Sequence, residues 1–529
     1  MTHQDLASFI WQIADILRGP YRPPQYERVM LPMTVLRRFD CVLAGTKDQV
    51  LAEYERQKDG KITGEALDGV LNRISGQRFH NHSPLTFEKL KGDPDNIDKH
   101  LASYIRGFSS NIQRIFEFFE FTNEIEKMRE SNILYLVVSK FCDVDLHPNE
   151  VDNHQMGLLF EDLIRKFNEA ANETAGDHFT PREVIRLMVD ILFNADDEIL
   201  SVPHTIRKML DPACGTGGML SEAQNYLDTY HKKADLFVFG QDFNPRAYAI
   251  AASDLLIRGH GASKIEFGDS LIDDKYKYDK FDYLLANPPF GVDWKRQQKD
   301  IVRESEKEGP EGRFGAGLPR VNDGSLLFLQ HMISKFEPVS PEKKKHGSRL
   351  GIVLSGSPLF SGGAGSGESN IRRWIIENDW LEAIIALPEQ MFYNTGIGTY
   401  IWIVTNRKEE RRKGKIQLID ARTRWKPLRR SLGDKRRELG DDDIQSIVKE
   451  YGDFTETDTS LIFDNNDFGY TRVTVERPLR LRYQMTLDDK VRFLDACPYL
   501  LDDVQAIDKE LGREPQLNWN KVSDGLEDP

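Results

Sequence analysis

Cysteine is scarce in this chain of 529 residues, and so are long apolar stretches. The spacing of the cysteines fits neither a disulfide framework nor a metal site, so we expect reduced thiols and no bound metal. No apolar run is long enough to span a bilayer, and the N-terminus carries acidic residues where a signal peptide has basic ones. These absences predict a cytoplasmic protein without a membrane partner. The cysteines are Cys41, Cys142, Cys214 and Cys497.

Positive charge is also in short supply, because acidic residues outnumber basic ones and leave a formal net charge of −14 at pH 7. Proteins bind nucleic acids mainly through Lys and Arg. A chain of this net charge therefore binds nucleic acids well only if its basic residues are clustered or a partner supplies further basic residues. One cluster is present, although a run of this kind is as often a solvated helix face or loop. It comprises Arg411, Arg412, Lys413, Lys415, Arg422, Arg424, Lys426, Arg429, Arg430, Lys435, Arg436 and Arg437.

The hydrophobic pattern divides the chain into three regions. Residues 1–170 show helical periodicity and predict an all-helical domain. Residues 171–407 alternate apolar strands with helices, which predicts an α/β domain with Thr399–Thr405 as its last central strand. Residues 408–529 are mixed and basic, with a helical pattern in their second half. The polar segment 291–324 interrupts the α/β alternation, and we expect a mobile loop there that orders around a substrate.

The sequence Asn287-Pro288-Pro289-Phe290 follows an apolar strand and joins an amide acceptor, a rigid turn and an aromatic ring. The Asn287 side-chain oxygen and the Pro288 carbonyl can both accept hydrogen bonds from one exocyclic amine, and Phe290 can stack on the ring that carries this amine. Two prolines fix φ and remove two backbone donors, so nearby carbonyls are free to face a ligand. An ordinary Pro-Pro turn after an edge strand is the alternative. We expect these four residues to hold a planar amine and to be catalytic.

Three further strand ends carry polar or glycine-rich chemistry upstream of that turn. A short strand runs into Asp211 and then into a glycine turn that opens a helix, which lets the backbone approach a ligand closely. The next strand ends in Asp242, where a doubly wound sheet commonly binds ribose hydroxyls, and the third ends in Asp269. Together with Asn287, these strand ends predict a single crevice. The glycine turn contains Gly215, Thr216, Gly217 and Gly218.

The order of these motifs resembles that of the N6-adenine DNA methyltransferases that use S-adenosylmethionine, and in particular the modification (HsdM-type) subunit of Type I restriction-modification systems. The likeness covers most of the chain up to about residue 480. Beyond the motifs above, it rests on the segment before the glycine turn, on two later strand segments and on an N-terminal segment. These are Asp177-His178-Phe179-Thr180-Pro181-Arg182, Gly351–Phe360, Ala383–Ile397 and Val29–Asp40.

The resemblance implies a Rossmann-like methyltransferase sheet, preceded by an all-helical domain and followed by a C-terminal helical extension. It implies S-adenosylmethionine as the cofactor, with the ribose on Asp242, the adenine beside Asp269 and the methionine end near Asp211 and the glycine turn. It assigns methylation of adenine N6 to the residues from Asn287 to Phe290. The residues implied to close over the methionine end are Asp177, His178, Phe179, Thr180, Pro181 and Arg182.

The resemblance also implies partners. The chain has no motif for sequence-specific DNA recognition that we recognise. Its net negative charge favours DNA binding to which another subunit also contributes contacts. We therefore expect double-stranded DNA as the substrate and a separate specificity subunit flanked by two copies of this chain. Helical regions near both termini, including Leu487–Leu511, are expected to make the contacts. A restriction or translocase subunit is compatible with the same resemblance.

Other functions fit parts of the pattern. The Asn-Pro-Pro-aromatic turn also serves enzymes that methylate a glutamine side chain or a ribosomal RNA base, and the same fold can act as a non-catalytic scaffold. The long N-terminal domain and the motif order favour DNA adenine. The loop Gly362–Ser369 has the glycine spacing of a phosphate-binding loop, but Glu368 stands where Lys is needed, so we expect no nucleotide triphosphate there. Phe392 and Tyr393 are expected either to line a base pocket or to belong to the core.

Overall fold

The computed structural model divides the chain into two compact units, Met1–Tyr470 and Thr471–Pro529. Within the described residues, no helix is long and apolar enough to cross a membrane. The second unit contains the C-terminal helical extension that the sequence predicts, as α20 (Leu487–Ala496) and α21 (Leu501–Glu510). The structure describes residues 9, 12–58, 60, 62–171, 180–259, 264–340, 342, 345–393, 395–471, 473–476 and 486–510.

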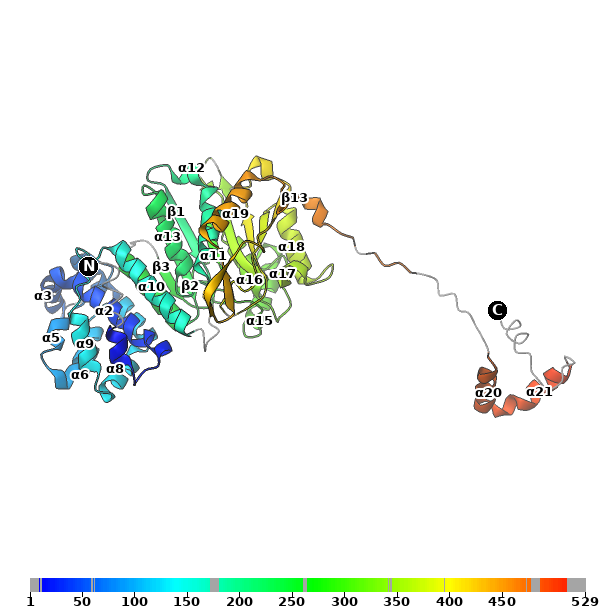
Figure 1. Cartoon of the computed structure of the whole chain (residues 1–529), viewed down its shortest axis with the longest axis horizontal. Coiled ribbons are helices and arrows are strands. Elements are labelled where there is room, and N and C mark those ends of the chain that lie inside the picture. Colours follow the sequence, from blue (N-terminus) through cyan, green and yellow to red (C-terminus); the bar gives the residue numbers. More distant parts are fainter. Residues whose placement is uncertain are drawn as a thin grey trace. The chain divides into compact units, whose positions relative to one another are not determined.

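The N-terminal region is helical, as its periodicity predicts (Figure 1). Helix α2 lies at its centre and is buried on most sides, which agrees with its mostly apolar sequence. The surrounding helices are amphipathic, and α6 buries Ile97, Leu101 and Tyr104 on one face. The helices are α2 (Glu27–Leu43), α3 (Lys47–Gln57), α4 (Glu65–Ser75), α5 (Phe87–Leu90), α6 (Ile97–Arg106), α7 (Ser110–Phe118), α8 (Phe121–Glu130), α9 (Leu134–Cys142) and α10 (Asn153–Ala171).

A nine-stranded sheet follows, in the order β13-β10-β8-β9-β7-β4-β1-β2-β3. Its strands are parallel except β9 and β13, which pair antiparallel with their neighbours. The strands are β1 (Ile206–Asp211), β2 (Asp235–Asp242), β3 (Lys264–Phe267), β4 (Tyr283–Ala286), β7 (Arg349–Ser355), β8 (Leu381–Ala386), β9 (Thr399–Thr405), β10 (Lys415–Asp420) and β13 (Ser460–Asp464). Two separate two-stranded sheets are β5 (Val339–Ser340) with β6 (Lys345–His346), and β11 (Lys426–Leu432) with β12 (Lys435–Glu438).

The sheet continues beyond residue 407, where the sequence pattern placed the end of the α/β domain. Strand β9 is central, as expected, but it is not the last strand, because β10 pairs with β8 and β13 pairs with β10. The first unit correspondingly extends to Tyr470. The prediction was wrong because β10 lies within the basic stretch, so charge obscured its apolar residues Ile416, Leu418 and Ile419.

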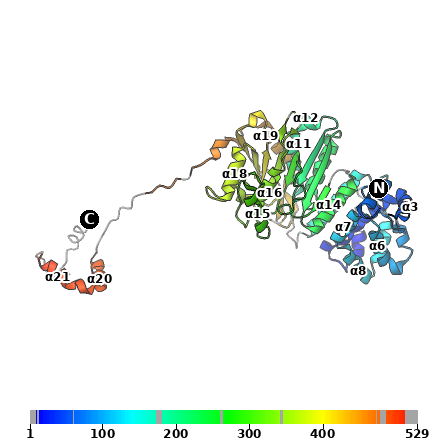
Figure 2. The ribbon, with the colours of Figure 1, turned by 180° about the vertical axis from the view of Figure 1, so that it is seen from behind.

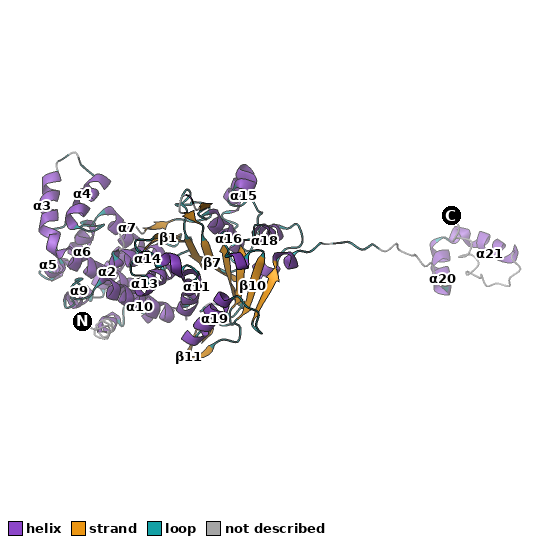
Figure 3. Cartoon of the chain, turned by 90° about the horizontal axis from the view of Figure 1, so that it is seen from above, coloured by secondary structure: helices purple, strands orange, loops and turns teal. Residues whose placement is uncertain are grey.

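Helices cover both faces of the sheet, as the continuous apolar character of its central strands requires. Alternate side chains of β4 enter different cores: Tyr283 and Leu285 pack on one face, and Leu284 packs on the other. Figure 3 shows α15, α16 and α18 on one side of the strands and α11, α13 and α19 on the other. The helices are α11 (Arg182–Asn194), α12 (Asp197–Leu200), α13 (Gly218–Tyr230), α14 (Pro245–Arg258), α15 (Gln298–Glu308), α16 (Ser325–Ser334), α17 (Ser357–Phe360), α18 (Gly367–Glu377) and α19 (Asp441–Asp453).

The segment 291–324 is folded, whereas the sequence predicted a mobile loop. It contains α15, and its side chains Trp294, Ile301 and Phe314 are buried in a small core of their own with Leu271 and Leu327. These few apolar residues are separated by charged ones, which is why the sequence reads as a polar loop. The segment therefore forms a small structured lobe that follows the Asn-Pro-Pro-Phe turn.

Helix α14 joins the N-terminal helices to the sheet. It packs against β2 and β3 on one side and against α7 and α10 on the other, and Figure 2 shows α14 next to α7. The aromatic ring of Phe118 lies 4.7 Å from that of Phe267 at this boundary. The hydrophobic core is continuous from the N-terminal helices to this face of the sheet.

Candidate functional site

The predicted strand ends meet at one edge of the sheet. Strand β1 lies between β4 and β2, so the chain proceeds from β1 to one side through β2 and β3 and returns to the other side with β4. Ligands of such sheets bind in the crevice outside the carboxyl ends of the strands, at the point where the order reverses. Asp211 ends β1 and Asn287 follows β4, so both residues lie at this reversal.

The glycine turn after β1 has backbone conformations that favour glycine. Gly215 has a φ of 52° and Gly217 a φ of 88°, in the left-handed region. A Cβ atom at Gly217 would lie 3.3 Å from that of Ala251, whereas a Cβ atom at Gly215 would meet nothing within 4 Å. The turn thus packs closely against α14 on one side and faces open space on the other. Helix α13 begins at Gly218, and its first N–H groups are available to a ligand at this end.

Asp211 is buried at the floor of the crevice. One of its carboxylate oxygens accepts a hydrogen bond from the Ala213 N–H at 3.0 Å. The pKa of this carboxyl is raised to about 8: burial is the main cause, the Ala213 N–H lowers the pKa, and the nearby charge of Asp242 raises it. Without a cation beside it, Asp211 is therefore largely protonated at neutral pH.

Asp242 holds the glycine turn in place. One carboxylate oxygen accepts from the Gly215 N–H at 2.8 Å and the other from the Asn244 N–H at 2.8 Å. A carboxylate oxygen can accept more than one hydrogen bond, so Asp242 is chemically suited to accept from a ribose hydroxyl as well. The adjacent Phe243 is 67% exposed, and its ring is free to cover a flat ligand. The sequence analysis missed Phe243; an aromatic residue directly after the acid of β2 is the feature that would have revealed it.

Asp269 connects the crevice to the lobe formed by residues 291–324. Its carboxylate accepts from the Leu271 N–H at 2.9 Å and from the Gln297 side-chain amide at 2.7 Å. Gln297 immediately precedes α15. The lobe thus contacts the acid that was predicted to lie beside the cofactor adenine.

Asn287 has a defined orientation at the end of β4. Its amide nitrogen donates to the Thr180 hydroxyl at 2.9 Å, and its amide oxygen is buried without a hydrogen-bond partner among the described residues. A buried acceptor without a partner is costly, and Asn287 lines a cavity, so this oxygen is available to a ligand that donates to it. The Phe290 ring is partly buried and lies edge-on to Phe392, with ring centroids 5.6 Å apart. Phe392 and Tyr393 are both buried, and Phe392 forms the wall behind Phe290.

A small cavity of about 30 Å³ brings several of the predicted residues together. It also includes residues that the sequence analysis did not single out, among them Ile185, Cys214 and Met219. Its lining consists of Thr180, Ile185, Asp211, Ala213, Cys214, Gly215, Thr216, Gly218, Met219 and Asn287.

Other predicted residues lie elsewhere. Gly217, Asp242, Asp269 and Pro181 do not line this cavity. Arg182 forms ion pairs with Glu161 at 3.2 Å and Glu222 at 3.8 Å, which direct its guanidinium toward α10 and α13. Asp177, His178 and Phe179 lie outside the described residues. The described residues contain no cluster suited to a metal ion.

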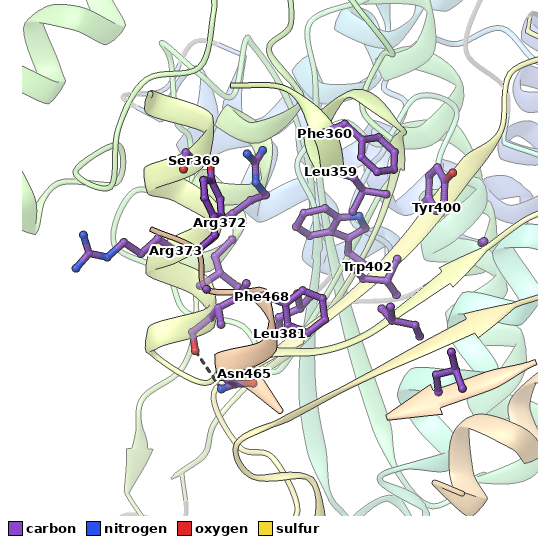
Figure 4. A pocket seen from close by; sticks show the side chains of 18 of the residues that line it. Leu359, Phe360, Ser369, Arg372, Arg373, Leu381, Tyr400, Trp402, Asn465 and Phe468 are labelled. Atoms are coloured by element: carbon purple, nitrogen blue, oxygen red, sulfur yellow. Dashed lines mark hydrogen bonds between the residues drawn. The ribbon is translucent and has the colours of Figure 1, made fainter. Parts of the chain in front are cut away.

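A second cavity, of about 1330 Å³, shares no lining residue with the first. Figure 4 shows it between α18 and the sheet, with Trp402, Leu381 and Phe468 around it. The glycine loop before α18 borders this cavity, but its polar groups are already engaged: Ser366 accepts from the Ser369 N–H at 3.3 Å, and Glu368 accepts from the Arg320 N–H at 3.0 Å.

The parallel sheet with its reversal at β1, the glycine turn, the acid at the end of β2 and the Asn-Pro-Pro-Phe turn together define a methyltransferase that uses S-adenosylmethionine. The chain belongs to the N-6 DNA methylase family, whose model matches residues 151–473; the model of the HsdM N-terminal domain matches residues 6–141. These matches confirm the predicted fold class, cofactor and reaction: the enzyme methylates N6 of adenine in DNA.

Known relatives agree with this assignment. The chain is 27% identical over 495 residues to the Type I restriction enzyme MjaIX methylase subunit of Methanocaldococcus jannaschii, covering 90% of this chain and 82% of that protein. It is 22% identical over 485 residues to the EcoKI methylase subunit of Escherichia coli K12, covering 86% and 77%. Its fold is similar to that of a type I methyltransferase subunit from Streptococcus thermophilus, with a TM-score of 0.66, 22% identity and coverage of 88% and 97%. The resemblance to modification subunits of Type I systems is thereby confirmed.

Proposed function

We propose that Asn287 presents its amide oxygen to the N6 amine of a target adenine, and that this contact is the centre of catalysis. The observation that carries the proposal is the hydrogen bond from the Asn287 amide nitrogen to Thr180, which leaves the oxygen as the buried group without a partner. An amide fixed in this way offers an acceptor and not a donor. It is therefore complementary to an exocyclic amine.

The target adenine leaves the duplex before its amine reaches Asn287. The Asn287 side-chain oxygen and the Pro288 carbonyl each accept one hydrogen bond from the N6 amine. Phe290 stacks on the adenine ring, with Phe392 behind it. These contacts direct the nitrogen lone pair into the crevice. S-adenosylmethionine supplies an electrophilic methyl group when it is bound. Methyl transfer would form the bond from nitrogen to the methyl carbon as the bond from that carbon to the cofactor sulfonium breaks, leaving a thioether. The nitrogen would then release one proton to solvent, so positioning and not a strong base determines the rate.

Different residues of the crevice bind the ribose, the adenine and the methionine end of the cofactor. Asp242 binds the ribose hydroxyls and Asp269 lies beside the adenine. Gly215 and Thr216 approach the methionine end, where the ammonium group favours the ionised form of Asp211. Asp177, His178, Phe179, Thr180, Pro181 and Arg182 close over this end. The open space at Gly215 and the unpartnered oxygen of Asn287 support this placement.

The chain acts as the modification subunit of a Type I complex, with two copies flanking one specificity subunit and, in the complete system, a restriction subunit. The names of the relatives support the role of a methylase subunit in a Type I system, and a similar fold, with a TM-score of 0.56 and 18% identity, occurs in a structure described as showing complex assembly of the type I system. We place the complex in the cytoplasm, where its DNA substrate is found.

Substitution of Asn287 tests the proposal. In a complex reconstituted with the specificity subunit, Asn287→Ala should lower the methylation rate by at least about a hundredfold, because the amine loses an acceptor that orients it. Cofactor affinity, measured by calorimetry, should stay within about twofold of wild type. The matched control is Asn149→Ala at an exposed position, which should methylate normally. A rate near wild type for Asn287→Ala would show that the site is wrongly assigned.

A further inference from the structure

The basic stretch between Arg411 and Arg437 separates into two groups in the structure. Most of its cations form ion pairs with acidic residues of the chain. Arg412 and Lys435, for example, are buried and pair with Glu382 and Glu183. The other internal pairs are Arg411 with Glu409, Lys413 with Glu410, Lys415 with Asp464, Arg422 with Asp420 and Arg424 with Glu450.

The cations that remain lie on the hairpin of β11 and β12, which we call the basic hairpin. Lys426, Arg429 and Arg436 are exposed and form no ion pair within the described part of the chain. Arg437 lies over the Trp425 ring at 4.1 Å, which holds its guanidinium at the base of the hairpin. Three exposed cations without ion-pair partners on one hairpin favour an anionic ligand at this position.

The basic hairpin is anchored next to the catalytic turn. The Arg436 N–H donates to the Gln390 carbonyl and the Asp434 N–H to the Tyr393 carbonyl, each at 2.9 Å. The Lys435 side chain reaches Glu183 on α11 and lies 5.1 Å from the centre of the Tyr393 ring. Tyr393 adjoins Phe392, whose ring packs against Phe290. Main-chain bonds and ring contacts therefore connect the hairpin to the wall of the base site.

The hairpin is also free of the main sheet. Its strands pair only with each other in the described residues, and Figure 3 shows β11 standing clear of the nine-stranded sheet, beside α19. A two-stranded ribbon of this size fits against the DNA backbone or into a groove.

We propose that the basic hairpin grips the DNA backbone beside the target adenine, with Lys426, Arg429 and Arg436 on phosphates. The inference rests on the proposed function and adds a surface to it. A surface that holds the backbone next to the extruded nucleotide fixes the position of the strand without reading its sequence. It also gives an acidic chain a local positive surface for DNA, since these three cations are exposed and form no ion pair within the described residues.

The test is the triple variant Lys426→Gln, Arg429→Gln and Arg436→Gln in the complex with the specificity subunit. DNA affinity is measured from about 50 to 300 mM salt, where each lost phosphate contact reduces the slope of log K against log salt by about 0.9. We expect the slope to fall by about 2 to 3 for each copy that contacts DNA, with at least a tenfold loss of affinity at low salt. Hydroxyl-radical footprinting should lose protection within a few base pairs of the target adenine.

A control variant carries the same change in charge at cations that are already paired. Arg373→Gln, Arg411→Gln and Lys413→Gln remove three exposed cations whose partners are Glu377, Glu409 and Glu410. This control should keep the wild-type slope and footprint, because net charge alone has little effect on local phosphate contacts.

The outcomes separate this inference from the proposed function. If the wild-type complex methylates adenine and the hairpin variant keeps its salt slope, affinity and footprint, the hairpin proposal fails alone. If the variant instead fails to assemble with the specificity subunit, the hairpin contacts an acidic protein surface and the proposal is overturned. Failure of the wild-type complex to methylate adenine would refute the proposed function itself. Unchanged cofactor affinity and unfolding temperature in the variant would show that it is correctly folded.

Discussion

At the scale of single residues, Thr180 determines which way the Asn287 amide faces. Its hydroxyl accepts from the amide nitrogen at 2.9 Å, and it is itself buried. Without that acceptor the amide can rotate and present its NH₂ group to the substrate amine. Both groups are then donors, and the hydrogen bond between them is lost. In the proposed mechanism Thr180 is thus a positioning residue, because it would act on the substrate through Asn287.

We expect Thr180→Val, which keeps the shape and removes the hydroxyl, to lower the rate at saturating cofactor about ten- to a hundredfold, corresponding to roughly 1–3 kcal/mol. Thr180→Ser, which keeps the hydroxyl, should restore most of the rate. Single-turnover methylation measures both. Equal rates in the Val variant and wild type would exclude the positioning role, and a Ser variant as slow as Val would indicate packing instead of hydrogen bonding.

Asp211 gives the cofactor-free protein a pH-dependent stability. Its carboxyl has an ordinary pKa of 3.8 and a pKa of about 8 in the folded chain, mainly because it is buried. The folded state therefore retains a proton that the unfolded state releases above pH 4. The stability from this group is fully present at low pH and is lost as pH rises toward 8.

Asp211→Asn removes this titration, so the variant should gain stability relative to wild type between pH 5 and 8, by up to roughly 5 kcal/mol. The measurement is denaturant unfolding of both cofactor-free proteins at several pH values. Parallel dependence of the two unfolding free energies on pH would contradict the raised pKa of Asp211.

At the scale of elements, a buried ionic network joins the late strands to the rest of the sheet. Glu382 at the start of β8 accepts from Arg349 of β7 and from the Tyr451 hydroxyl of α19, both at 2.7 Å, and Arg412 lies 3.6 Å away. Burial alone would raise the pKa of Glu382, but Arg349 and Arg412 hold it below its ordinary value. The network thus keeps a charge in the core by surrounding it with partners.

Loss of the Glu382 charge should destabilise the folded protein. Glu382→Gln should reduce the free energy of unfolding by about 3–5 kcal/mol, because two arginines lose their buried counter-charge. The matched control is Glu377→Gln, which breaks an exposed pair with Arg373 and should cost less than about 1 kcal/mol. Denaturant unfolding compares the two variants, and similar small losses in both would show that the network contributes little.

The early strands and the site motifs were predictable because their signals are local. An apolar run followed by Asp211 or by Asn287 identifies both a strand and its chemistry within a few residues. The contact between Thr180 and Asn287 was not predictable, since it joins positions distant in sequence that only the folded sheet brings together. The same holds for β10, whose membership of the sheet depends on pairing with β8.

At the scale of the whole molecule, the division into two units predicts separable roles. The crevice and the catalytic turn belong entirely to Met1–Tyr470, while α20 and α21 belong to the second unit. A chain that ends at Tyr470 should bind S-adenosylmethionine like the full chain and should not assemble with the specificity subunit. Light scattering of the mixed subunits measures assembly, and calorimetry measures cofactor binding.

A milder change addresses the same division without truncation. Leu501 is 41% exposed at the start of α21, and Leu501→Asp should weaken assembly while leaving the cofactor site untouched. If both the truncated chain and this variant assemble normally, the specificity subunit binds the first unit and the predicted role of the C-terminal helices is wrong.

The burial of the cysteines makes the natural chain suitable for selective labelling. Cys41, Cys142 and Cys214 are buried, and burial raises the pKa of Cys41 and of Cys142 to about 11 and that of Cys214 well above its ordinary value. Very little reactive thiolate exists at these positions at neutral pH. Cys497, after α20, is partly exposed. A maleimide fluorophore therefore attaches first to the C-terminal unit, and its anisotropy follows that unit during assembly without any engineered residue.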